Sequence, residues 1–267
     1  MKFFVVTLAI VGLSMAMPVA GISQVDDLVA YWKFDGDPKD ATGNGHDGQM
    51  KGVAALVKND GAPIEGPKGA VKFLKKDGNA VQIANSADLR ISQNLTLMAW
   101  ANPDDSGPTQ YVAGVPHDDQ AQWDDPWVGH QIGVRGGAMA TWLNLVEGGV
   151  AKDREYDSGQ VASKEWTHLA FVFTGDEAIS YVNGEEVANH KDRKGEIQFI
   201  GDPLFMIGER SHIAIGEPFG GLIDEVALFK AALSEDDINE FMSGIPLSVQ
   251  PGGKLPTSWG YVKSRRD

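Results

Sequence analysis

Short stretches of apolar, β-branched and aromatic residues recur along most of the chain, and clusters of Gly, Asn, Asp and Pro separate them. Runs of this length are typical of strands, and the residues between them favour tight turns. The pattern therefore predicts an all-β, two-sheet antiparallel sandwich. The expected strands are 28–34, 70–74, 80–84, 95–101, 111–115, 127–134, 140–146, 166–173, 178–182, 186–189, 204–207 and 222–229.

Two local signals are more specific. Asn183-Gly184 lies between two strand-like segments and predicts a type I′ hairpin, because both turn residues must take positive φ. Ser234 and Asp237 have the spacing of a capping box and predict the start of a short helix. Apolar residues at helical spacing follow, which indicates packing against the sandwich.

The first 23 residues have the layout of a secretory signal peptide. Lys2 precedes an uncharged apolar run, and small residues follow that run. The run is too short to span a membrane comfortably, and an uncleaved N-terminal anchor is the alternative. No later apolar run is long enough to cross a bilayer. We expect export to the periplasm, the cell surface or the medium, with a mature start between residues 17 and 25.

The sequence divides into a signal peptide (1–23), a single domain (24–245) and a flexible basic tail (246–267). The tail is rich in Ser, Pro, Gly and basic residues, and anchoring or targeting is an alternative role for it. The chain has no cysteine, so the domain must be stable without disulfides, which suits bacterial export.

The formal net charge is −14. This charge repels nucleic acids and anionic membranes, so we expect no nucleic-acid partner. Divalent cations, neutral sugars and basic proteins remain compatible with it. The charge leaves the oligomeric state open.

Four ordered segments carry a family resemblance. They are V-A-Y-W-K-F-D at 29–35 with D-A-T-G-N-G-H-D-G at 40–48, L-T-L-M-A-W-A-N-P at 95–103, E-W-T-H-L-A-F-V-F at 165–173 with Y-V-N-G at 181–184, and F-G-G-L-I-D-E-V at 219–226 with A-L-S-E-D-D-I at 232–238. Together they resemble the laminin G-like, concanavalin A-like lectin/glucanase modules of bacterial exported proteins. The resemblance covers about residues 27–243 and implies a two-sheet jelly roll with one short C-terminal helix. The fold serves lectins, adhesion modules and enzymes alike.

The resemblance also implies one structural Ca²⁺ that ties the first and last strands together. Calcium takes hard oxygen ligands, and the Gly-Asn-Gly turn can aim several carbonyl groups at one point. The candidate ligands are the side chains of Asp35 and Asp224, with a carbonyl from Asn44 or His46. In the alternative interpretation, Asn44 and the glycines only form the turn and Asp224 caps a strand end.

Zinc is not expected, because the six histidines lack ligand spacing. His168 alternates with Trp166 and Ala170 in an expected strand, which favours a packed, hydrogen-bonded core histidine.

The loop between residues 104 and 129 combines acidic and aromatic side chains. Tryptophan rings stack on sugar rings, and carboxylates accept hydrogen bonds from sugar hydroxyls. The predicted glycan-binding residues are Trp123, Trp127, Asp118, Asp119, Asp124 and Asp125. A second calcium site, a contact with a basic protein, or a solvated loop with Trp127 tucked into the sheet are the alternatives. Tyr156 and the charged run 152–157 form a second candidate loop.

Catalysis is not expected. Glucanases of the resembled superfamily carry E-x-D-x-E on one strand, and the nearest segment here is Glu196-Ile197-Gln198-Phe199. Asp224 and Glu225 are adjacent, so on a regular strand they face opposite sides and cannot act as a pair. No nucleophile or nucleotide-binding motif is present.

The sequence thus predicts an exported, non-catalytic binding module for a glycan or polysaccharide. A domain that binds an extracellular protein and a divergent glycoside hydrolase or polysaccharide lyase are the alternatives.

Overall fold

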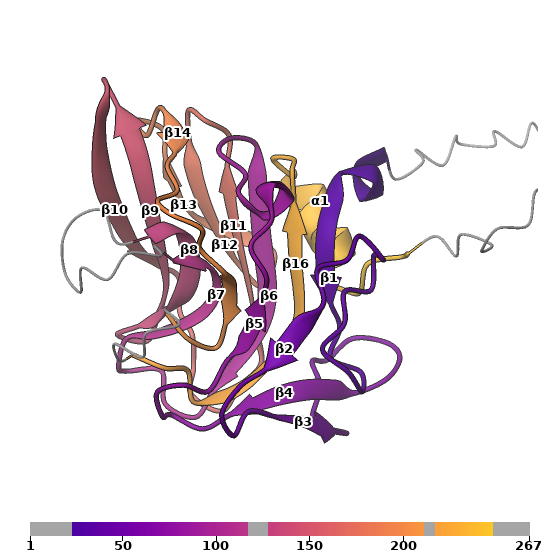
Figure 1. The fold of residues 1–267 in the computed structure, drawn as a ribbon. Helices are drawn as coiled ribbons and strands as arrows, with labels where there is room; N and C mark the ends of the chain where they lie inside the picture. The colour runs from indigo at the N-terminus through magenta and orange to yellow at the C-terminus, as the bar shows by residue number, and fades with distance from the viewer. Residues whose placement is uncertain (1–22, 117–127, 211–216, 248–267) are drawn as a thin grey trace, which may run out of the picture.

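Two antiparallel sheets of eight strands each lie face to face in the computed structural model, which describes residues 23–116, 128–210 and 217–247 (Figure 1). Sheet A has the order β13-β12-β11-β6-β16-β4-β3, and β1 pairs with the C-terminal half of β16. Sheet B has the order β10-β9-β8-β7-β15-β5-β2, and β14 pairs with β9. This is the all-β jelly-roll sandwich that the sequence predicts.

The strands of sheet A are β1 (Leu28–Trp32), β3 (Ala55–Lys58), β4 (Gly69–Phe73), β6 (Leu95–Pro103), β11 (Thr167–Phe173), β12 (Ala178–Val182), β13 (Glu185–His190) and β16 (Gly221–Phe229). Those of sheet B are β2 (Gly48–Met50), β5 (Val81–Ile83), β7 (Gln110–Pro116), β8 (Val128–Arg135), β9 (Ala138–Glu147), β10 (Val150–Ser158), β14 (Glu196–Ile197) and β15 (Phe205–Ile207). Two 3₁₀ helices, η1 (Ser23–Asp27) and η2 (Ala87–Leu89), and the α-helix α1 (Glu235–Phe241) complete the described elements.

The inward faces of the two sheets form one continuous hydrophobic core. Trp32 of β1 stacks on Phe205 of β15 with ring centroids 5.0 Å apart, and both side chains are fully buried. This ring pair joins sheet A directly to sheet B. Burial of one large apolar side chain contributes about 1.5–3 kcal/mol, so such contacts hold the sheets together without a disulfide.

The helix and hairpin signals are both confirmed. Ser234 Oγ accepts a hydrogen bond from Asp237 N, and the Asp237 side chain accepts one from Ser234 N, which completes the capping box of α1. Phe241 of α1 stacks on Phe229 at 5.3 Å, so the helix packs on the outer face of sheet A (Figure 1). Asn183 and Gly184 have φ values of 51° and 83°, as a type I′ turn requires.

Every expected strand overlaps an observed one, but β2, β3, β10 and β14 were not expected. The charged run 152–157 lies inside β10, so the prediction of a second candidate loop there is wrong. β10 is an edge strand of sheet B, and it carries charged side chains on both of its faces. An edge strand of this kind lacks the apolar alternation by which strands are recognised.

A β-bulge in β16 corrects a second expectation. Asp224 is paired with Trp100 and Ala227 with Met98, so two residues of β16 face one residue of β6. Glu225 takes a φ of 50° at this bulge. The Glu225 side chain lines the same enclosed space as Trp100, on the outer face of sheet A. Asp224 is paired with Trp100, so its side chain lies on that face as well. The two acidic residues therefore share a face.

Nothing in the three described ranges forms a helix long and apolar enough to span a membrane. The expected signal peptide, apart from its last residue, and residues 248–267 of the expected tail lie outside the described residues.

Candidate functional site

The turn at 40–48 is organised by the buried carboxylate of Asp40. Its Oδ1 accepts hydrogen bonds from Tyr31 N at 3.2 Å, Thr42 N at 3.0 Å and Thr42 Oγ1 at 2.7 Å. Its Oδ2 accepts one from His46 N at 3.2 Å. These bonds attach the turn to the edge of β1 that does not pair with β16.

Asn44 and His46, two of the predicted calcium ligands, belong to the same attachment. Asn44 Nδ2 donates to the carbonyl oxygen of Val29 at 2.9 Å, and the His46 carbonyl accepts from Trp32 Nε1 at 2.8 Å. Side chains that satisfy the backbone of an edge strand also keep it from pairing with another chain. The observed contacts of both residues are thus those of a turn that caps an edge strand.

Asp35 and Asp224, the other two predicted ligands, have other partners. Asp224 is buried, and its two oxygens accept from Ala62 N and Glu225 N, both at 2.9 Å. Burial raises the pKa of Asp224 to about 7, although these hydrogen bonds lower it and the charge of Asp35 raises it further. Asp35 Oδ2 pairs with Lys33 Nζ at 3.4 Å.

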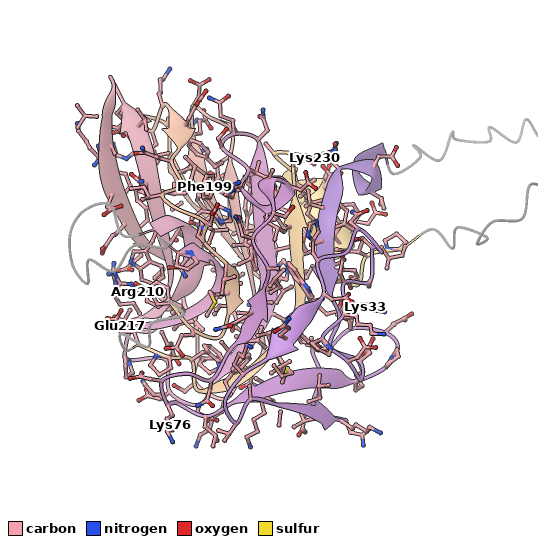
Figure 2. The ribbon with its side chains drawn as sticks, in the orientation of Figure 1. Lys33, Lys76, Phe199, Arg210, Glu217 and Lys230 are labelled. Atoms are coloured by element: carbon pink, nitrogen blue, oxygen red, sulfur yellow. The ribbon has the colours of Figure 1, made fainter. Side chains whose placement is uncertain are left out.

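The predicted ligands line more than one groove, although Asp35 lies near enough to Asp224 to raise its pKa. Asn44 and His46 line a groove of about 520 Å³ beside Lys230, whereas Asp35 lines a different one beside Lys33; Figure 2 labels both lysines. Among the residues that the structure describes, no group of three or more His, Cys, Asp or Glu side chains is placed to hold a metal ion. The predicted calcium site at Asp35, Asp224 and a carbonyl of Asn44 or His46 stays a prediction.

Binding of a structural calcium ion can be tested in solution. A ligand that binds only the folded state raises the free energy of unfolding by RT ln(1 + [L]/Kd), and the unfolding temperature rises with it. Thermal unfolding in millimolar calcium and in excess chelator tests it. A higher unfolding temperature in calcium supports the site, and equal temperatures contradict it.

Each of the four family segments contributes at least one side chain to an enclosed space beneath α1. These side chains are Tyr31, Met98, Trp100, His168 and Glu225. Trp100 Nε1 donates to the carbonyl oxygen of Met242 just after the helix, at 3.1 Å. The convergence indicates that these motif residues fix the docking of α1 on sheet A.

His168 is fully buried, as the sequence predicts, but the expected hydrogen bonds to its ring are wrong. Within the described part of the chain, neither ring nitrogen has a hydrogen-bond partner. The ring packs edge-on against Trp100 at 5.3 Å.

Five buried titratable groups make the stability depend on pH in two opposite ways. Burial lowers the pKa of His130 and His168 from 6.5 to about 3. Burial raises the pKa of Glu209 and Asp224 to about 7 and that of Glu225 to about 8. Between pH 6.5 and 3 only the unfolded chain protonates the histidines, so stability falls as pH falls. Between about pH 4 and 8 only the folded chain keeps the carboxyl groups protonated, so stability falls as pH rises.

We therefore expect the free energy of unfolding to be largest at about pH 4.5, where the folded and unfolded chains bind equal numbers of protons at these five groups. Urea unfolding from pH 3 to 9 measures this profile. Glu209→Gln is expected to reduce the fall in the free energy of unfolding above pH 6, because Glu209 is buried. Glu65→Gln, at an exposed position, is the matched control. A profile that rises steadily to pH 8 contradicts the prediction.

The predicted glycan-binding residues Trp123, Trp127, Asp118, Asp119, Asp124 and Asp125 all lie outside the described residues. Their role stays a prediction. The described strands on either side of them, β7 and β8, nevertheless present a polar surface of their own on the outer face of sheet B.

That surface follows from strand alternation. In β10, Asp153, Glu155 and Asp157 share one face, and the register places Glu155 beside Trp142 of β9. Across the next strands, Trp142 pairs with Gln131. The outer face of sheet B therefore carries carboxylates at its β10 edge and an aromatic side chain next to them.

Four side chains on this face form what we call the Arg–aromatic cluster: Arg135, Trp142, Tyr111 and Arg210. The rings of Tyr111 and Trp142 are 4.3 Å apart, the Arg135 guanidinium lies 5.4 Å from the Trp142 ring centre, and that of Arg210 lies 5.8 Å from the Tyr111 ring centre. Both distances suit cation–π contact. The absence of a side chain at Gly133 matters here, because a Cβ would approach the Trp142 ring to 2.9 Å.

Carboxylates flank both ends of the Arg–aromatic cluster. Arg135 Nε donates to both oxygens of Asp157 at 3.0 and 3.1 Å, and Arg135 Nη1 donates to Glu155 at 2.7 Å. At the other end Arg210 Nη1 lies 3.9 Å from Glu217; Figure 2 shows these two residues next to each other. The rings are 3% exposed, whereas the side chains of Glu155, Asp157 and Glu217 are 37%, 44% and 37% exposed. A ligand would thus meet carboxylates above an aromatic floor.

Sequence reasoning missed this cluster, although one signal for it was present. The run K-D-R-E-Y-D at 152–157 alternates with period two, which places three acidic side chains on one face of a strand. The partners elsewhere have no such signal, because the register of sheet B brings Arg135 and Tyr111 to the same surface, and Arg210 lies beyond β15, where its carbonyl accepts from Gln131 Nε2 at 3.1 Å.

The architecture and this polar face define a β-sandwich of the lectin type. A family model described as "Concanavalin A-like lectin/glucanases superfamily" matches residues 75–239, and the chain belongs to this family. No curated protein matches the chain.

Solved structures share the fold at low sequence identity. The chain is similar to domain 4 of AbnA, a GH43 extracellular arabinanase from Geobacillus stearothermophilus, in complex with arabinotriose. The TM-score is 0.60 at 21% identity over 81% of this chain and 98% of that one. It is also similar to the binding domain of Paraclostridial Mosquitocidal Protein 1, with a TM-score of 0.61 at 16% identity over 81% of this chain and 52% of that one.

A third similar structure is the botulinum neurotoxin serotype D ligand-binding domain in complex with N-acetylneuraminic acid. Its TM-score is 0.55 at 17% identity over 83% of this chain and 52% of that one. The chain therefore spans about half the length of the two toxin domains, and the likeness to all three structures concerns the fold.

Proposed function

We propose that this protein is a non-catalytic carbohydrate-binding module that binds glycans on the outer face of sheet B, above the Arg–aromatic cluster. The observation that carries the proposal is the set of half-exposed carboxylates, Glu155, Asp157 and Glu217, over a nearly buried aromatic floor. Carboxylates accept hydrogen bonds from sugar hydroxyls, and the paired guanidinium groups hold them in fixed positions. The domain of an arabinanase with the same fold, solved with arabinotriose, also supports it.

The described carboxylates of the site favour binding over catalysis. A retaining glycosidase needs an acid and a nucleophile about 5–5.5 Å apart, with one pKa raised. Glu155 and Asp157 instead both form ion pairs with the same guanidinium, that of Arg135. We infer that these carboxylates bind a ligand without acting on it.

The direct test is a glycan and polysaccharide array on the mature protein, followed by titration calorimetry on the strongest hit. Glu155→Ala with Asp157→Ala is expected to weaken binding at least tenfold, because it removes two acceptors and releases Arg135. Glu185→Ala with Glu186→Ala is the matched control: it removes the same charge from exposed positions on β13, in the other sheet, and should leave binding unchanged. Equal losses in both variants, or no hit for a protein shown to be folded, contradict the proposal.

Protein binding is the second candidate, and the net charge of −14 is the observation that favours it. Attraction of a basic protein weakens steeply with salt, whereas hydrogen bonds to a neutral sugar are less sensitive. Binding to a basic protein that is lost at high salt and unaffected by Glu155→Ala with Asp157→Ala would support this second candidate instead.

An exported location, as the N-terminal sequence predicts, would bring the module to extracellular polysaccharides. N-terminal sequencing of the protein from the periplasm or medium should give a start between residues 17 and 25. A full-length N-terminus in that fraction would support the uncleaved anchor.

A further inference from the structure

We propose that the site on sheet B selects neutral, hydroxyl-rich glycans and rejects acidic ones such as uronates, sialosides and sulfated sugars. This inference rests on the proposed function and specifies its ligand class. It depends on which hydrogen-bonding groups of the site already have partners and which face the solvent.

The guanidinium of Arg135 is already committed to protein carboxylates. Its Nε and Nη2 face Asp157, the latter at 2.9 Å, and its Nη1 faces Glu155 at 2.7 Å. A planar guanidinium recognises the carboxylate of a sugar through this same fork of nitrogen atoms. An acidic sugar would have to displace Asp157 or Glu155, and the displaced carboxylate would stay close to the anion.

At the opposite end of the site, the guanidinium is also paired with a protein carboxylate. Arg210 is nearly buried, with 4% of its side chain exposed, and its partner Glu217 is the more exposed member of the pair at 37%. Across the site, three carboxylates, Glu155, Asp157 and Glu217, face two guanidinium groups, and Asp153 lies on the same face of β10. The excess is negative, as it is for the whole chain.

The hydrogen-bonding positions that the site offers to a ligand are therefore mainly acceptors. A carboxylate offers about four acceptor positions, and one guanidinium cannot occupy all the positions of two carboxylates. Hydroxyl groups can donate to the remaining positions, whereas a ligand carboxylate or sulfate has only acceptors and repels them.

The test uses a matched pair of ligands made from one glycan. The strongest neutral hit of the array is oxidised at its primary hydroxyls to carboxylates, and both forms are titrated into the protein. We expect the oxidised form to bind at least tenfold more weakly, and the difference to shrink as salt screens the repulsion.

A variant then reverses the selection. Glu155→Gln with Asp157→Asn keeps the side-chain shapes, removes two negative charges and frees Arg135. We expect this variant to bind the oxidised glycan more tightly than the unchanged protein does, while its affinity for the neutral form falls. Glu185→Gln with Glu186→Gln removes the same charge on β13 and should alter neither affinity.

The outcomes separate this inference from the proposed function. An array with no glycan hit contradicts the proposed function and this inference with it. Hits that are mainly uronates, sialosides or sulfated glycans keep the function and overturn the selectivity. A preference for the aminoglycan chitosan that disappears at high salt also overturns it, because a cationic ligand would then be the match for these carboxylates.

Discussion

Trp32→Ala is expected to lower the free energy of unfolding by about 3–5 kcal/mol, the range of large aromatic truncations in a core. Trp32 is fully buried and stacks on Phe205 of the other sheet at 5.0 Å. Its indole N–H also donates to the carbonyl of His46, so the same side chain holds both the sandwich and the 40–48 turn. Urea unfolding with an unchanged m-value measures the loss.

Trp32→Phe separates the two contributions. Phenylalanine can keep a ring against Phe205 but leaves the His46 carbonyl without its donor. We expect a loss of about 1–3 kcal/mol from the missing hydrogen bond, plus the cost of the smaller ring. If Trp32→Ala costs no more than Trp32→Phe, the ring stack does not join the sheets as we argue.

Asp40→Ala is expected to cost about 3 kcal/mol or more, with equal effect in calcium and in chelator. The carboxylate accepts four hydrogen bonds from the turn and from Tyr31, and its removal leaves those donors without a partner. The loss of the turn would also uncover the edge of β1. Thermal and urea unfolding in both buffers measure the effect.

The control for Asp40→Ala is Asp37→Ala, three residues earlier. Asp37 is exposed and accepts a hydrogen bond from Lys39 N at 3.0 Å. Surface substitutions of this kind usually change stability by about 0.5 kcal/mol or less. A loss for Asp40→Ala that occurs only in calcium would show that the turn is held by a metal and not by its own hydrogen bonds.

Much of the fold could be predicted because its signals are local. The type I′ turn at Asn183-Gly184 needs only the φ preferences of two residues, and the capping box of Ser234 and Asp237 only a spacing of three. The buried strands were recognisable from their continuous apolar runs. The short strands and the charged edge strand β10 were not, because an exposed edge needs little apolar surface.

The candidate site could be predicted only in small part. The adjacency of Asp224 and Glu225 suggested opposite faces, but the β-bulge in β16 puts both on one face. The contacts of Asn44 and His46 could not be predicted either: the Asn44 side chain donates to the backbone of β1, and the His46 carbonyl accepts from the indole of Trp32. These partners come from a strand distant in the sequence, so spacing within the turn does not reveal them.

The sequence by itself determined the class of fold, the helix and hairpin, and the family, because each depends on patterns within a few residues or on ordered motifs. The tertiary structure alone decided that Arg135, Trp142, Tyr111 and Arg210 form one cluster, and that carboxylates of β10 flank it. The physical reason is strand register for Arg135, Trp142 and Tyr111, because a shift of one residue would turn each of them to the other face; Arg210 is placed by the chain beyond β15. That register is set by the packing of the whole sheet and is not encoded near any one of them.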